Sequence, residues 1–164
     1  MKKTILIIMI IAAIVLPLTA AAPTLNIQKA AKGQFGAGVN LGTNLGAAVK
    51  WDNKDWDLYA NIGAGYIGSN GFHFQGEVGA EFPVYQFEIE NQKFYVNVGG
   101  LIPVGVGSYG VDLGILATAG LSYDFKDIPL TMYARTGLGV VLLFSDPVKV
   151  SFGGSGAIGA IWLF

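Results

Sequence analysis

The chain has 164 residues, a formal net charge of −1 and a hydrophobic content of 52%. Its charged residues make up 13%, against about 25% in typical soluble domains, and its lysines and arginine are scattered, so we expect no nucleic-acid partner. It has no cysteine, which excludes disulfides, cysteine-based metal sites and thiol nucleophiles.

Residues 1–21 have the three-part pattern of a secretory signal peptide. Lys2 and Lys3 form a basic start, an apolar run follows over residues 5–18, and small residues come next. Pro23 disfavours a cut directly before it, so we expect cleavage after Ala20 or Ala21. The alternative is an uncleaved anchor, for which the run is short of the ~20 residues that a membrane-spanning helix needs. We expect residues 22–32 to be a periplasmic lead-in and residues 33–164 to form one domain.

From residue 33 onward, large apolar residues alternate with small or polar ones, which is the period of a β-strand with two different faces. Turn-forming residues interrupt the alternation at regular intervals. The longest later apolar run, residues 138–144, is too short for a membrane-spanning helix. The pattern predicts one or two strands over residues 33–51 and further strands over residues 56–68, 72–89, 94–106, 111–125, 130–144 and 148–164.

Two places in this pattern leave alternatives open. Residues 33–51 keep one parity throughout and form either one long strand or two strands broken at residues 42–44. After Pro83 the alternation reverses its phase, which predicts a bulge or a strand exit, because proline cannot donate to a ladder.

The last strand carries the most specific signal. Its even-numbered residues from Val148 to Phe164 are all apolar or glycine, and its aromatic end suits the interfacial girdle of a membrane barrel. A final strand with this alternation and a terminal phenylalanine resembles the assembly signal of bacterial outer-membrane β-barrels. The residues that carry the resemblance are Ile158, Ala160, Trp162 and Phe164.

This resemblance, to the small OmpA/OmpX-type barrels, implies an all-β, antiparallel, up-and-down transmembrane β-barrel of eight strands. It further implies insertion by the barrel-assembly machinery with periplasmic chaperones, membrane lipid as surroundings, and a monomer in the bacterial outer membrane. The chain departs from the family in its short turns, which puts loop-mediated adhesion in doubt. Aromatic residues near strand ends are interpreted as interfacial belts: Trp51, Trp56, Phe72, Phe94, Phe125, Phe144, Trp162 and Phe164.

The main alternative is a secreted soluble β-sandwich that binds a partner. A sandwich should carry its bulky residues inside and polar residues outside. Here one face is large and apolar, while the other holds glycine, serine and single charges. That distribution favours a narrow barrel whose outside meets lipid.

Three inward charges are the candidate site. Arg135 is the only arginine, and it lies mid-strand on the inward parity, as do Glu77 and Glu81. A charge in a narrow lumen needs a partner, so we expect an Arg135–Glu77 or an Arg135–Glu81 bridge. Such a bridge is either a structural plug or a constriction that gates small ions.

His73, the only histidine, is expected at the rim as a hydrogen-bonded polar residue. A lipid-modifying barrel enzyme would need an activated nucleophile near it, and no nucleophile signature surrounds it, although Ser69 and Glu77 are near in sequence. One histidine cannot form a histidine-rich metal site. We therefore expect no catalysis, no cofactor and no metal.

The sequence thus predicts an integral outer-membrane barrel with a structural or narrow-pore role. The alternatives are a lipid-modifying barrel enzyme, a secreted soluble domain, and a carrier of hydrophobic molecules with a lateral opening. Inward Pro83 and Pro103 are the places where such an opening is expected.

Overall fold

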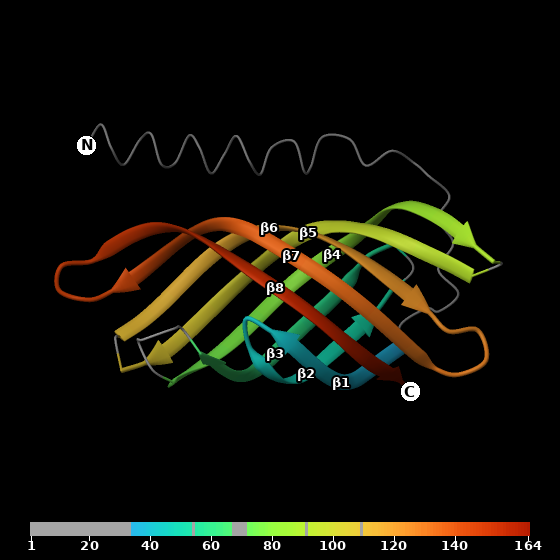
Figure 1. Ribbon diagram of the computed structural model, residues 1–164, viewed down its shortest axis with the longest axis horizontal. Helices are drawn as coiled ribbons and strands as arrows, with labels where there is room; N and C mark the ends of the chain where they lie inside the picture. Colours follow the sequence, from blue (N-terminus) through green and yellow to red (C-terminus); the bar gives the residue numbers. More distant parts are fainter. Residues whose placement is uncertain (1–33, 54, 67–71, 91, 109) are drawn as a thin grey trace.

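The computed structural model describes residues 34–53, 55–66, 72–90, 92–108 and 110–164; the expected signal peptide and lead-in lie outside them. Eight strands follow one another: β1 (Gln34–Gly42), β2 (Leu45–Asp52), β3 (Asp57–Tyr66), β4 (Phe72–Ile89), β5 (Gln92–Gly107), β6 (Gly110–Asp124), β7 (Leu130–Phe144) and β8 (Lys149–Leu163). Each pairs antiparallel with the next, and β8 pairs with β1 to close a barrel (Figure 1). The predicted all-β, up-and-down architecture of eight strands is confirmed.

In the described part of the chain, no helix has both the length and the apolar character needed to cross a membrane.

The first predicted strand divides at the turn that the sequence left undecided. Asn40 pairs with Gly46, and its side-chain amide donates to the backbone oxygen (2.9 Å) and the side-chain oxygen (2.6 Å) of Asn44. Thr43 anchors the turn to the last strand, because its N–H donates to the Gly156 oxygen at 2.8 Å. The described part of this segment therefore forms two short strands, Gln34–Gly42 and Leu45–Asp52.

Pro83 and Pro103 interrupt the hydrogen-bonded ladders locally, and the neighbouring strands stay paired on either side of them. β4 runs through Pro83, and its register with β5 shifts between Pro83 and Tyr85, which is the bulge expected from the phase reversal. The β5–β6 pairing skips from Leu101 to Val104 because Pro103 has no N–H to donate, and it then resumes. The barrel stays paired on both sides of each proline.

Large apolar side chains cover the outside of the barrel. Ile62 on β3 is 67% exposed and Phe152 on β8 is 76% exposed, and the same alternation continues around the ring. The inward rows are buried and carry most of the polar groups. Two small apolar clusters fill the remaining interior: Ala48, Ile161 and Leu163 with Tyr133, and Tyr59, Leu101 and Leu116 with Val141.

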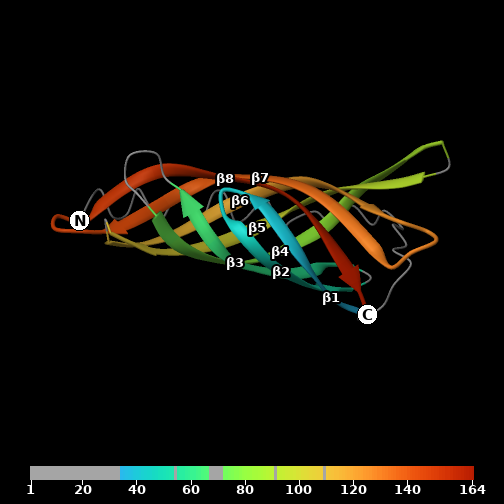
Figure 2. The ribbon, with the colours of Figure 1, turned by 60° about the horizontal axis from the view of Figure 1, so that its bottom comes forward.

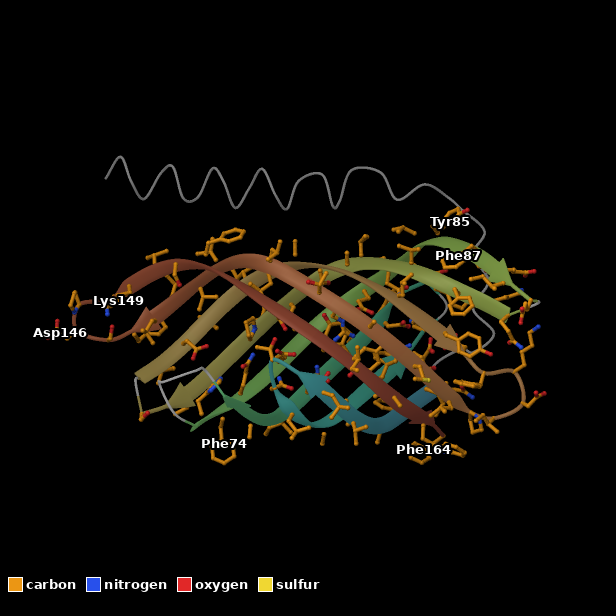
Figure 3. The ribbon with its side chains drawn as sticks, viewed as in Figure 1. Phe74, Tyr85, Phe87, Asp146, Lys149 and Phe164 are labelled. Carbon is orange, nitrogen blue, oxygen red and sulfur yellow. The ribbon has the colours of Figure 1, made fainter. Side chains whose placement is uncertain are left out.

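Aromatic side chains gather at the end of the barrel where the C-terminus lies (Figure 3). One group stacks Phe35 on Trp51, whose ring meets Trp56 edge-on. A second runs through Tyr85, Phe87, Phe94, Tyr123 and Phe125, with neighbouring ring centroids 4.5–6.2 Å apart. We call this the terminal end; Asp146 and Lys149 mark the opposite, outer end (Figure 3). Of the expected belt residues, Phe144 lies at the outer end, and the Phe72 side chain lies outside the described residues.

The barrel wall is shorter where β1 and β2 form it than where β7 and β8 form it. The β1–β2 hairpin turns back at residues 43–44, whereas β7 and β8 continue much farther toward the outer end (Figure 2).

Candidate functional site: the polar interior of the barrel

The polar side chains of the lumen form three layers between the terminal and outer ends. The layer nearest the terminal end is built on Lys50 of β2. Its ammonium group lies 3.3 Å from the Asp52 carboxylate and 3.0 Å from that of Asp57, and all three side chains are at most 9% exposed. Because β2 and β3 meet at this turn, the register places the two aspartates opposite each other, and the lysine supplies the charge that they need.

The middle layer is built on Arg135 of β7. Its guanidinium forms an ion pair and hydrogen bond with Glu81 of β4 across the lumen, and both side chains are 8% exposed. Two tyrosine rings flank the guanidinium, with the Tyr59 centroid 3.4 Å and the Tyr133 centroid 4.9 Å from its central carbon. A cation between two aromatic faces gains electrostatic stabilisation in addition to its ion pair.

The tyrosines are themselves fixed. The Tyr133 hydroxyl donates to the Asn40 side-chain oxygen at 2.7 Å, which ties β7 to the β1–β2 turn. Each ring also covers a glycine on the neighbouring strand. A Cβ at Gly79 would lie 2.3 Å from the Tyr59 ring, and one at Gly159 would lie 2.4 Å from the Tyr133 hydroxyl. These glycines provide the space that lets two rings enter a narrow barrel.

The outer layer is built on Glu77 of β4. Its carboxylate accepts hydrogen bonds from Asn61 (3.1 Å), Gln75 (2.9 Å) and Ser155 (3.4 Å), and the residue is 3% exposed. A ring nitrogen of His73 lies 3.1 Å from the Gln75 side-chain oxygen, and the ring occupies the space over Gly65. Neutral amides and a hydroxyl thus surround the carboxylate.

The space left in the middle of the lumen is very small. A cavity of about 10 Å³ lies between the Lys50 and Arg135 layers, lined among others by Tyr59, Glu81 and Ile161. One water needs roughly 10–15 Å³. This cavity therefore has room for about one water.

The structure brings together part of the predicted site. Of the two bridges left open by the sequence, it forms Arg135–Glu81, while Glu77 lies in a separate layer and takes neutral partners. His73 faces inward near the outer end and is 1% exposed, so it is buried rather than at an exposed rim. Ser69 lies outside the described residues. The four assembly-signal residues, Ile158, Ala160, Trp162 and Phe164, lie on the outer parity of β8.

Two features were missed by the sequence reasoning. Tyr59 and Tyr133 share the inward parity of Arg135, and this signal could have identified them as its aromatic partners. The Lys50 layer was not predicted because the expected strands end at residue 51 and begin again at residue 56, which leaves Asp52 in the connection between them. Among the described residues, no group of three or more metal-ligating side chains is placed to hold a metal ion.

No protein-family model, no curated protein and no solved structure matches this chain.

Proposed function

We propose that the chain is an integral β-barrel of a bacterial outer membrane, with a structural role and an interior sealed by its own side chains. One observation carries the proposal: the distribution of polarity is inverted relative to a soluble protein. Lys50, Asp52, Asp57, Glu77 and Glu81 are at most 8% exposed, while large apolar side chains such as Ile62, Phe74 and Phe152 are more than 60% exposed. Only an apolar surrounding makes such an exterior favourable.

Closure of the sheet supports the same conclusion. Lipid offers no hydrogen-bond partner, so a sheet that spans a membrane needs its backbone groups paired within the barrel. The β1–β8 pairing from Gly36–Leu163 to Gly42–Ala157 provides this for the terminal half of the seam. A soluble sandwich would leave sheet edges instead, and would bury its apolar face.

The sealed lumen favours a structural role over an open pore. The Arg135–Glu81 pair, the flanking tyrosines and the Leu101–Leu116 cluster fill this part of the lumen, and the cavity beside them, described above, measures about 10 Å³. Gating by this layer remains the second candidate, because a single ion pair holds it. In this proposal no residue is catalytic and no cofactor is bound.

Export and assembly are part of the proposal. The signal-peptide pattern of residues 1–21 supports secretion to the periplasm, and membrane lipid, chaperones and the barrel-assembly machinery are the expected partners. Trp162 and Phe164 lie on the outer face with 46% and 75% exposure, which leaves them accessible to a receptor that reads the last strand. The expected product is a monomer.

The test is refolding of residues 22–164 into phospholipid vesicles, followed by flotation in urea. We expect the chain to float with the vesicles. Ile62→Arg should weaken insertion, because a cation near the bilayer centre of a barrel costs about 2–4 kcal/mol. Asp127→Arg, in an exposed turn, is the matched control and should insert normally. A chain that stays soluble without lipid or detergent would refute the proposal.

A further inference from the structure

The barrel wall has an opening above the β1–β2 turn. β1 pairs with β8 only as far as Gly42–Ala157, and the Thr43 contacts with Gly156 end that seam. On the other side, β2 pairs with β3 only as far as Leu45–Ala64. β8 continues to Lys149, so among the described residues neither β1 nor β2 lies between β3 and residues 149–155 of β8 (Figure 2).

The edge of β8 that borders this opening carries polar backbone groups. The N–H and the oxygen of Gly156 both hydrogen-bond Thr43, so they point toward β1. Backbone groups alternate in direction along a strand, and those of Val150, Phe152 and Gly154 therefore point into the opening. Within the described residues, no strand pairs with this stretch of the β8 edge.

In the proposed bilayer, the opening lies at the depth of the outer leaflet. A strand tilted by about 40° rises about 2.5 Å per residue, so the outer row of β8 from Trp162 to Val150 rises about 30 Å, the thickness of the hydrocarbon core. The outer row of β1 from Phe35 to Leu41 rises only about 15 Å. Val150 and Phe152 are 55% and 76% exposed, so the lipid-facing surface continues beside the opening.

The inner side chains beside this stretch change character along the barrel. The polar layer of Glu77 and Ser155 lies nearest the middle of the barrel, two apolar side chains of β7 follow, and a lysine lies at the outer end. Val141 and Leu143 of β7 face inward and are half-buried, and Val141 packs on the buried cluster of Tyr59, Leu101 and Leu116. Across the ladder from them, inward Ser151 and Lys149 of β8 are exposed.

The carboxylates near Lys149 form no ion pair with it. Asp146 lies three residues before it in the exposed β7–β8 turn, and the two side chains are not within ion-pair distance of each other. The Asp112 carboxylate occupies the space over Gly105 on β5, which directs it away from β8. Glu77 lies deeper and is held by Asn61, Gln75 and Ser155. Among the described residues, Lys149 has no ion-pair partner within 4 Å.

We propose that this opening is a side entrance for a single-chain anionic amphiphile of the outer leaflet, of the long-chain carboxylate class. The acyl chain enters between β8 and β3 and lies on Val141 and Leu143, and the head group binds Lys149. Water at the head group hydrates the exposed β8 edge, which lipid alone would leave unsatisfied. This inference rests on the proposed membrane function.

The experiment uses single-cysteine variants, which are clean because the chain has no cysteine. Ser151→Cys reports the inner wall, and its neighbour Val150→Cys reports the lipid-facing wall. Each is labelled with bimane and placed in phosphatidylcholine vesicles, and quenching is measured with 12-doxylstearate or with doxyl-phosphatidylcholine at equal doxyl content.

We expect both probes to quench the bimane fluorescence of Val150→Cys in proportion to their content. For Ser151→Cys, we expect only 12-doxylstearate to quench the fluorescence, and this quenching should saturate. Adding Lys149→Gln should raise the half-saturating stearate fraction about fivefold, the effect of losing one partly exposed charge contact. Lys126→Gln, at the terminal end, should leave it unchanged.

Absence of quenching at Ser151→Cys would overturn the side entrance. Equal quenching there by both probes, unchanged by Lys149→Gln, would overturn the anionic single-chain ligand. Absence of quenching at Val150→Cys by either probe would instead refute the proposed membrane function itself.

Discussion

Arg135 and Glu81 lie 54 residues apart in the sequence and on strands three places apart in the barrel, yet their side chains form an ion pair across the lumen. The pair connects β7 to β4, which are not neighbours in the sheet. Two tyrosine rings flank the guanidinium, and the Arg135 side chain is 8% exposed. This layer joins opposite walls of the barrel and closes its interior.

Removing one partner of this pair should destabilise the barrel strongly. Arg135→Ala leaves the Glu81 carboxylate buried without its cation, which costs about 3–5 kcal/mol. The double variant Arg135→Met/Glu81→Leu removes both charges and should lose much less. The free energy of unfolding is measured by urea titration in vesicles, followed by tryptophan fluorescence. Equal losses in the single and double variants would show that packing, not the ion pair, is responsible.

The glycine beneath Tyr59 should tolerate no side chain. In Gly79→Ala the new Cβ would lie 2.3 Å from the tyrosine ring and 2.7 Å from the Gly100 oxygen, so the ring must move off the guanidinium. We expect a loss of roughly 1–3 kcal/mol in the free energy of unfolding, typical of overpacking. Gly156→Ala is the matched control, because nothing lies within 4 Å of its Cβ position. Similar losses in both variants would contradict the ring-over-glycine interpretation.

The Lys50 layer at the terminal end predicts how the stability of the barrel depends on the charges of Lys50, Asp52 and Asp57. Lys50→Met leaves Asp52 and Asp57 facing each other in a buried site without a cation. We expect it to be more destabilising than Lys50→Met combined with Asp52→Asn and Asp57→Asn, since the triple variant has no charge left to compensate. Equal stability of the single and triple variants, measured by the same urea titration, would argue against a charge network here.

The closed lumen predicts an absence of steady conductance. In planar bilayers the native barrel should add no stable current above the lipid baseline, because its middle layer leaves a cavity of only about 10 Å³. Arg135→Ala/Glu81→Ala should give small conducting steps, whereas Lys126→Ala should behave as the native chain. Stable current through the native protein would favour the narrow-pore function over the structural one.

The strand pattern could be predicted from the sequence because apolar side chains on the exposed outer face alternate with small or polar side chains on the inner face. The outer residues are apolar or glycine at every second position over most of each strand, and a phase change such as the one at Pro83 identifies a bulge. The break at residues 42–44 could not be decided, because a turn that preserves parity leaves no trace in the alternation.

The contacts across the lumen were harder to predict. Parity shows that Arg135, Glu77 and Glu81 face inward, but the choice of partner depends on stagger between strands that are not neighbours. The register places Glu81 at the level of Arg135, and it leaves Glu77 to Asn61 and Gln75. Under the carrier alternative the sequence offered Pro83 and Pro103 as places for an opening, and the ladder stays paired on both sides of each. The short β1–β2 hairpin, where pairing with β8 and β3 ends, was not considered for this role.

The most direct test of the central claim is a spin-label scan along β6, from Ile115 to Leu121, in phospholipid vesicles. Collision with oxygen, which concentrates in lipid, should be high at Ile115, Ala117, Ala119 and Leu121, and low at Leu116, Thr118 and Gly120. This alternation is the signature of a barrel whose apolar face meets lipid and whose polar face fills the lumen. The opposite phase, or uniform exposure to a water-soluble relaxation agent, would contradict the account and favour a soluble β-sandwich.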